Sequence, residues 1–190
     1  MNAPAHLRRT VAYLGRRGSF SEEACQRFLP ACELMPLADF EAVAMAVCQG
    51  SADVGVLPIR NSVAGPIDAV RVLLAHPELR MVAEEDVDIR LHLLASNGTS
   101  LGAIREVASH RAALQQCETF LTDHQLAAVE APSTSEAARQ VADAKDPARA
   151  AIASEVAADI YGLTIVARDV QGDRASITRF AIVERRDHYA

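Results

Sequence analysis

The chain has 190 residues, of which 50% are hydrophobic and 23% charged, so it is long enough and apolar enough to bury a core in one or two small domains. Its 25 acidic residues outnumber 19 basic ones, and aromatic residues make up only 4% with no Trp. A nucleic-acid partner is not expected, because there is neither a dense basic tract nor a set of rings on which bases could stack.

The N-terminus and the cysteines indicate the cellular compartment. Residues 1–10 lack the apolar core of a signal peptide, and no run reaches the roughly 18 apolar residues that a membrane span needs. The four cysteines are scattered and form no CxxC pair (Cys25, Cys32, Cys48, Cys117). This spacing favours reduced thiols over a disulfide framework or a zinc site. We therefore expect a soluble cytoplasmic protein with no membrane partner, no metal and no cofactor.

Strands and helices alternate before residue 80. In chain order they are a strand at 11–14, a helix from about 21, a helix at 39–49, a strand to Ile59 and a helix at 67–74. Ser19 or Ser21 caps the first helix, Gly50 ends the second and Pro77 stops the third.

The most informative stretch follows the strand that ends near Ile59. The polar group Arg60, Asn61 and Ser62 comes directly after it, and the chain then turns at Gly65. Because ligands sit at the carboxyl ends of strands in α/β sheets, these side chains are candidates for a binding site. A turn in which Asn61 and Ser62 satisfy only their own backbone explains the same pattern, so both interpretations stay open here.

The same alternation continues after about residue 85. Strands are expected at 89–95, 106–109, 126–130, 150–153, 163–166 and 179–183, and helices at 110–121, 133–144 and 154–162. A βαβα rhythm predicts parallel sheets flanked by helices. Its repetition on both sides of about residue 85 suggests two α/β lobes with a cleft between them.

Six short motifs in order along the chain resemble the catalytic domain of prephenate dehydratase. They are Gly18-Ser19-Phe20-Ser21-Glu22-Glu23-Ala24, Pro58-Ile59-Arg60-Asn61-Ser62, Ser109-His110 with Gln115-Gln116-Cys117, Ser133-Thr134-Ser135, Ala151-Ile152-Ala153-Ser154 with Tyr161-Gly162-Leu163, and Thr178-Arg179-Phe180. Each motif is weak alone, but six at suitable intervals cover nearly the whole chain.

The resemblance implies two small α/β lobes with a cleft, similar to type II periplasmic binding proteins. Because the chain of such a fold crosses between the lobes twice, we expect lobe one at 1–86 plus 176–190 and lobe two at 87–175. The resemblance also implies a homodimer or homotetramer, and we expect no regulatory domain. The implied activity is that of a hydro-lyase: prephenate loses CO2 and water to give phenylpyruvate in phenylalanine biosynthesis, without a cofactor.

This reaction needs a proton donor for the leaving hydroxyl and a site for the pyruvyl carboxylate. By resemblance the donor is Thr178, and the other catalytic residues are Asn61, Ser62 and Gln116. The residues expected to bind substrate are Ser19, Ser21, Arg60, Ser133, Thr134, Arg179 and Phe180. For Arg179 a structural pairing with an acid is an equal alternative, and Phe180 is also expected to belong to the core.

Two positions depart from the family pattern. Arg60 stands where the family has Glu, and Ser176 stands two residues before Thr178 where the family has Asn. Arg60 cannot serve as an acid near neutral pH, but it could bind an extra negative charge. That option favours a non-aromatising prephenate decarboxylase or a dehydratase of a related dienyl acid. A two-lobed solute-binding or sensor domain is a third alternative. Thr178 favours chemistry over binding alone and argues against a non-aromatising enzyme, but the sequence does not separate prephenate dehydratase from the alternatives that Arg60 suggests.

Overall fold

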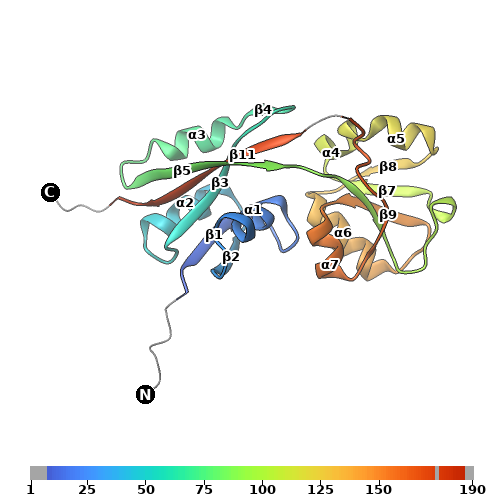
Figure 1. The fold of residues 1–190 in the computed structure, drawn as a ribbon, viewed down its shortest axis with the longest axis horizontal. Helices are drawn as coiled ribbons and strands as arrows, with labels where there is room; N and C mark the ends of the chain where they lie inside the picture. The colour runs from blue at the N-terminus through green and yellow to red at the C-terminus, as the bar shows by residue number, and fades with distance from the viewer. Residues whose placement is uncertain (1–7, 174–175, 187–190) are drawn as a thin grey trace, which may run out of the picture.

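The computed structural model describes residues 8–173 and 176–186 and arranges them as two α/β lobes (Figure 1). Lobe one contains β1 (Thr10–Leu14), α1 (Phe20–Phe28), β2 (Glu33–Leu37), α2 (Phe40–Cys48), β3 (Val54–Asn61), β4 (Gly65–Pro66), α3 (Asp68–Leu74), β5 (Leu79–Asp88) and β11 (Ile177–Arg185). Lobe two contains β6 (His92–Ala95), the short 3-10 helix η1 (Leu101–Ala103), β7 (Glu106–Ser109), α4 (Arg111–Gln116), α5 (Glu118–Asp123), β8 (Ala127–Glu130), α6 (Thr134–Ala144), β9 (Arg149–Ala153), α7 (Glu155–Tyr161) and β10 (Thr164–Ala167). The expected two-lobed α/β architecture is confirmed.

Side-chain caps begin several helices at the predicted places. Ser19 accepts a hydrogen bond from the backbone N–H of Glu22, and Ser133 accepts one from that of Glu136. Ser154 caps α7 in the same way. A cap satisfies a backbone donor that the helix cannot pair, which is why these starts follow from sequence alone.

Both sheets are mixed, which corrects the prediction of parallel sheets. The sheet of lobe one has the order β2-β1-β3-β11-β5 with β4 on β3, and that of lobe two has the order β10-β6-β9-β7-β8. Strand β11 is antiparallel to β3 and β5, and β6 is antiparallel to β9 and β10. The physical reason is the path between the lobes: β3 ends near the cleft, whereas β11 enters lobe one from the cleft and runs the opposite way (Figure 1).

Three strands were not predicted, namely β2, the two-residue β4 and β5, and one predicted helix is divided. Strand β5 carries Glu84, Glu85, Asp86 and Asp88, and such acids are poor strand formers. It forms nonetheless because β11 pairs along its whole length. Strand β2 was also missed, and the helix expected at 110–121 consists of α4 and α5, which Cys117 separates.

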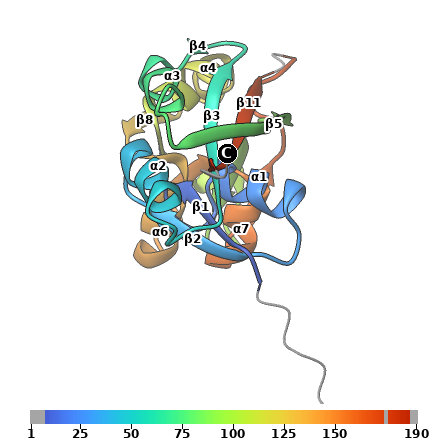
Figure 2. The same ribbon diagram turned by 90° about the vertical axis from the view of Figure 1, so that its left-hand side faces the viewer.

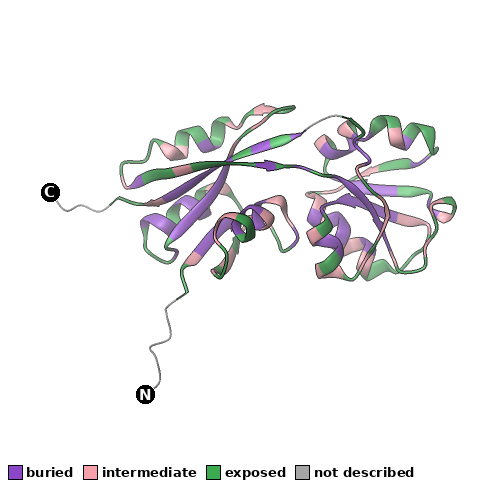
Figure 3. Ribbon diagram, in the orientation of Figure 1, coloured by how far each residue is buried: buried purple, intermediate pink, exposed green. Residues whose placement is uncertain are grey.

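Helices cover both faces of the lobe-one sheet, and one core runs through both lobes. Helix α1 lies on one side of β1 and α2 on the other (Figure 2). The apolar cluster under α1 includes Tyr13 and Phe180 from lobe one and continues into lobe two through Leu91, Leu93 and Ile152. The strands at the centre of lobe one, β3 and β11, are accordingly buried over much of their length (Figure 3).

Most of the cysteine side chains are buried in the core. Cys25, Cys48 and Cys117 are buried, Cys32 is half-buried and all four are free. Burial raises the pKa of the Cys117 thiol to about 12, so this group stays protonated. Within the part of the chain that the structure describes, no helix combines the length and the apolar character needed to cross a membrane.

Candidate active site

A cavity of about 380 Å³ lies between the lobes, and both contribute to its wall. Its apolar wall is formed by Leu14, Phe20, Pro58, Ala64, Ile67, Ile89, Leu91, Ala112, Ala113, Pro132 and Phe180. Its polar wall includes Ser19, Ser21, Asn61, His110, Gln116, Ser133, Thr134, Ser135, Ser176 and Thr178. None of the described lining residues is Asp, Glu, Lys or Arg, so a charged ligand in the cavity would be held by dipoles and hydrogen bonds.

Asn61 on β3 and Thr178 on β11 face each other across the two strands. The Asn61 amide donates from Nδ2 to Oγ1 of Thr178 at 2.9 Å and to Oγ of Ser176 at 3.1 Å. Its Oδ1 accepts from the backbone N–H groups of Val63 and Ala64, each at 2.9 Å. These two contacts fix the orientation of the amide. If the side chain were flipped, its NH2 group would face the N–H groups of Val63 and Ala64, and no hydrogen bond could form there.

The Thr178 hydroxyl is therefore an acceptor toward Asn61 and keeps its own proton for another partner. Among the described residues none accepts that proton. Thr178 is 8% exposed and lines the cavity, so the proton is available to a bound molecule and shielded from bulk water. The same Asn61 N–H would stabilise negative charge on Oγ1 if that proton were transferred.

A β-bulge turns Asn61 into the cavity. Along β3, Arg60 pairs with Arg179 and Pro58 pairs with Phe180, so Ile59 is the extra residue. Strict alternation would place Pro58 and Asn61 on opposite faces. The bulge brings both to the cavity side, a known use of such irregularities beside functional sites.

Two helix N-termini reach the cavity from opposite lobes. Ser19 and Ser21 belong to the start of α1, and Ser133 and Thr134 belong to the start of α6. The first N–H groups of a helix lack intrahelical partners and carry the positive end of the dipole, so they bind anions. This pair can hold a carboxylate without a cationic side chain.

Gln116, the last residue of α4, completes the polar wall. Its Oε1 is buried and has no hydrogen-bond partner among the described residues. A buried acceptor without a donor costs free energy, so a donor on a bound molecule would stabilise this arrangement.

Three predicted site residues do not line the cavity. Arg179 points to the other face of the sheet and binds Asp86 with two contacts of 2.8 Å, so the structural alternative for this residue is the one observed. Arg60 is exposed on that same face, opposite Arg179. Ser62 accepts from the backbone N–H of Ile177 at 2.9 Å. These placements correct the expectation that Arg60 and Arg179 bind substrate in the cleft.

The prediction also missed part of the wall. Ile67, Ile89 and Leu91 carry no signal beyond ordinary core residues, because their role follows from the packing of the two lobes. Ser135, which belongs to a family motif, and Ser176, which departs from the family pattern, also line the cavity but were not predicted as site residues. His110 caps α4, accepting the Ala112 N–H at Nδ1, and is the only titratable side chain in the described part of the wall.

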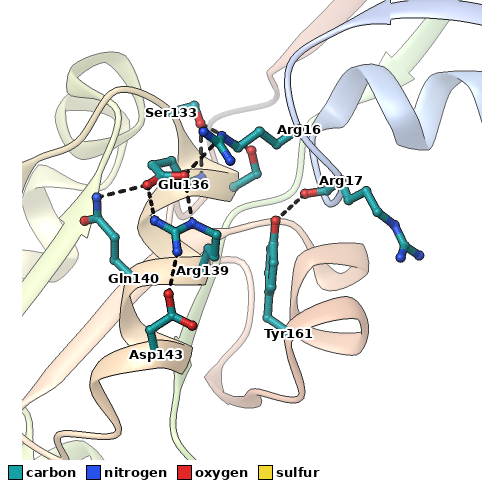
Figure 4. A network of polar contacts seen from close by, with 9 residues as sticks. Arg16, Arg17, Ser133, Glu136, Arg139, Gln140, Asp143 and Tyr161 are labelled. Atoms are coloured by element: carbon teal, nitrogen blue, oxygen red, sulfur yellow. Dashed lines mark hydrogen bonds and ion pairs between the residues drawn. The ribbon is translucent and has the colours of Figure 1, made fainter. Parts of the chain in front are cut away.

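Polar contacts between the lobes hold the loop before α1 against lobe two (Figure 4). Arg16 pairs with Glu136 of α6 at 3.2 Å, and the Tyr161 hydroxyl donates to the carbonyl of Arg17 at 2.8 Å. Arg139 donates two hydrogen bonds to Glu136 and holds the pKa of that carboxyl below its ordinary value. These contacts orient the two helix starts toward one another.

Gly18 allows this close approach. Its φ is +81°, and a Cβ there would lie 3.0 Å from Ala157 of lobe two. The Ser154 hydroxyl donates to the Gly18 carbonyl at 2.9 Å, and the Gly18 N–H donates to the buried carboxylate of Glu22 at 2.6 Å. A larger residue would push the lobes apart at the edge of the cavity.

Residues 11–188 match a protein-family model described as prephenate dehydratase. A protein of Arabidopsis thaliana named arogenate dehydratase/prephenate dehydratase 2, chloroplastic, is 42% identical over 92% of this chain and 46% of its own length. The bifunctional chorismate mutase/prephenate dehydratase of Escherichia coli strain K12 is 35% identical over 93% of this chain and 47% of its own. The chain thus spans about half the length of these relatives.

Solved structures show the same fold. A prephenate dehydratase of Arthrobacter aurescens in complex with L-Phe has a TM-score of 0.85 and 29% identity, over 94% of this chain and 61% of that one. A protein described as GqqA, a novel type of quorum quenching acylase, has a TM-score of 0.88 and 31% identity, over 95% and 66%. Because the family model spans nearly all of these residues, the chain belongs to the prephenate dehydratase family.

Proposed function

We propose that this chain converts prephenate to phenylpyruvate, with loss of CO2 and water, in phenylalanine biosynthesis. The observation that carries the proposal is the Thr178 hydroxyl, oriented by Asn61 at the wall of a cavity between two helix N-termini. Expulsion of a ring hydroxyl requires a proton donor shielded from water, and Thr178 offers one in a largely apolar, uncharged site.

In the proposed reaction, the bond between the ring and its carboxylate breaks and CO2 leaves. The electron pair moves through the ring and expels the hydroxyl at the opposite carbon, and the ring becomes aromatic. Thr178 donates its proton to the departing oxygen, which leaves as water, and solvent then returns a proton to Oγ1. The Asn61 N–H, at 2.9 Å from Oγ1, stabilises the charge on that oxygen meanwhile.

The rest of the cavity fits the remaining parts of prephenate. The starts of α1 and α6 would hold the pyruvyl carboxylate, and Phe20, Leu91 and Phe180 would pack against the ring. The described wall offers no Arg or Lys to the ring carboxylate. Weak retention of this group favours its departure, because tight binding would stabilise the substrate more than the transition state.

The keto acid is favoured over its amino counterpart, arogenate, after which several relatives are named. A buried ammonium group is held best by a carboxylate, and the described wall contains neither Asp nor Glu, so only neutral acceptors such as Gln116 Oε1 would face it. The non-aromatising alternative rested on Arg60, whose side chain is exposed on the other face of the sheet.

The test is turnover by the purified chain of prephenate and, in parallel, arogenate. Phenylpyruvate is followed by its absorbance at alkaline pH and phenylalanine by chromatography. We expect phenylpyruvate from prephenate, a lower kcat/KM for arogenate, and the same rate after treatment with EDTA. A non-aromatic product, or no turnover of either acid by folded protein, would overturn the proposal.

We also propose that the chain acts as a cytoplasmic homo-oligomer. Strand β5 is an edge of the lobe-one sheet, and the side chains of Met81 and Val82 on it are exposed. An edge strand pairs with a second copy where its exposed side chains are apolar, so the contact would form at Met81 and Val82 and not at the acidic end of β5. Light scattering should report a dimer or tetramer, and a monomer at working concentration would contradict this.

A further inference from the structure

A cluster of three potential metal ligands lies in lobe one, outside the cavity. Cys48 is the last residue of α2, and His76 and Glu78 flank Pro77 in the connection from α3 to β5. One ligand atom from each residue lies within 4.8 Å of the other two. This connection is at the end of lobe one farthest from lobe two (Figure 1), so the cluster is separate from the proposed active site.

We propose that Cys48, His76 and Glu78 bind a thiophilic divalent cation of the Zn²⁺ class. Thiolate, imidazole and carboxylate are the three ligand types that Zn²⁺ uses in proteins, and the fourth tetrahedral position would be taken by water. The Cys48 Sγ and His76 Nδ1 are 3.6 Å apart. Zn–S and Zn–N bonds of about 2.3 and 2.05 Å at a tetrahedral angle place sulfur and nitrogen about 3.5–3.6 Å apart.

The imidazole presents the correct atom to the thiol. His76 Nδ1 accepts a long hydrogen bond, 3.3 Å, from the backbone N–H of Glu78 and lies 3.6 Å from Cys48 Sγ, so a cation bound at Nδ1 would take its single lone pair and replace this weak contact. A thiol proton can occupy the position of the cation when the cation is absent. On binding, Cys48 loses this proton to solvent and the sulfur forms the metal bond, so binding releases one proton.

Charge and backbone structure favour binding. The Glu78 carboxylate has no ion-pair partner among the described residues, so it is available as a ligand and its negative charge attracts a cation. Backbone hydrogen bonds already hold the connection: Leu79 N–H donates to the His76 carbonyl at 3.0 Å, and Arg186 N–H donates to that of Glu78 at 2.7 Å. Little ordering is therefore needed when the ligands close on a metal. The cation would tie the end of α2 to the start of β5.

The experiment is a titration of the full chain with Co²⁺, read by thiolate-to-metal charge transfer in the near ultraviolet and by visible bands of tetrahedral Co²⁺, followed by displacement with Zn²⁺. We expect one equivalent, with a rise in melting temperature. Cys48→Ser should abolish charge transfer. His76→Ala and Glu78→Gln should each weaken binding by about tenfold or more, since even outer-shell partners contribute 10–100-fold.

Cys32→Ser is the matched control, because it removes a half-buried thiol outside the cluster and should leave binding unchanged. His76 and Glu78 are exposed, so their substitutions test the site even if Cys48→Ser fails to fold. Absence of charge transfer in the wild-type chain, its persistence in Cys48→Ser, or unchanged affinity in both His76→Ala and Glu78→Gln would overturn the proposal. None of these readouts depends on prephenate turnover.

Discussion

The two faces of the β3–β11 ladder differ in how they handle polar groups. On the cavity face, Asn61 and Thr178 form a partly buried pair without a formal charge. On the opposite face, Arg60 and Arg179 are exposed, and Arg179 pairs with Asp86. A hydrogen bond that is shielded from water is stronger than one in water, whereas exposed ion pairs are screened. We therefore expect catalysis to depend on the uncharged face and the charged face to affect stability only slightly.

The largest expected effect comes from Thr178. Thr178→Val keeps the shape of the side chain but removes the proton donor, so kcat should fall by roughly 10²-fold or more. KM should change little, because the lost interaction belongs to the transition state. Steady-state kinetics with prephenate measure both constants.

Two further variants control this prediction. Thr178→Ser retains a hydroxyl and should recover part of the rate, whereas Thr164→Val removes an exposed hydroxyl on β10, outside the cavity, and should have no effect. An undiminished rate in Thr178→Val would remove this residue from the mechanism. If His110→Gln were then inactive, the proton donor would be His110.

Asn61 should have the next largest effect, as a positioning residue that acts through Thr178. Asn61→Asp keeps an oxygen for the Val63 and Ala64 N–H groups but replaces the donor to Thr178 with an acceptor. We expect kcat to fall by about tenfold or more with little change in KM.

A purely structural role for Asn61 predicts a different outcome. In that case Asn61→Ala, which removes the turn contacts as well, would lower the melting temperature and the Asp variant would retain full kcat. Ser176→Ala removes only the second acceptor of the amide and should leave kcat near that of the wild type.

Arg60→Glu should have a small effect on catalysis. The side chain is exposed on the face away from the cavity, where water and salt screen its charge, so kcat and KM should each change by less than about twofold. Kinetics at two ionic strengths check this. A steep rise in KM would mean that Arg60 binds substrate after all, and would contradict the contrast between the faces.

The smallest expected effect concerns Asp86. Its hydrogen bonds from Arg179 lower the pKa of the carboxyl from 3.8, so the pair contributes stability that is present above about pH 3.8 and is lost as the pH falls through the lower folded value. Asp86→Asn has no carboxyl at this position, so it should not show this loss of stability at low pH. Urea midpoints measured above and below pH 3.8 compare the two proteins. The difference should be slight because the pair is exposed. An altered kcat in Asp86→Asn would show that the outer face contributes to catalysis.

The parts of the site that follow from local sequence were predicted at the correct positions. Ser19 and Ser133 begin α1 and α6 because a cap bonds to a backbone group only three residues away. Motif resemblance selected Thr178, Asn61 and Gln116, which all line the cavity. Their chemical roles stay predictions until the variants are measured.

Long-range pairing explains what the sequence did not reveal. The bulge at Ile59 depends on the register between β3 and β11, which are more than 110 residues apart, and it decides that Asn61 faces the cavity while Arg60 does not. Strand β5 carries four acids and forms because β11 pairs with it. Neither the bulge in β3 nor the formation of β5 can be predicted from local secondary-structure propensity.

By itself, the sequence determined the alternation of strands and helices, the helix starts and the family motifs, because each depends on residues a few positions apart. The tertiary structure alone decided that the sheets are mixed, that two helix N-termini meet across one cavity, and which polar residues face it. It also placed Cys48 beside His76 and Glu78. These features arise when distant segments pack together, since burial and pairing across the fold outweigh local preference in setting where a side chain points.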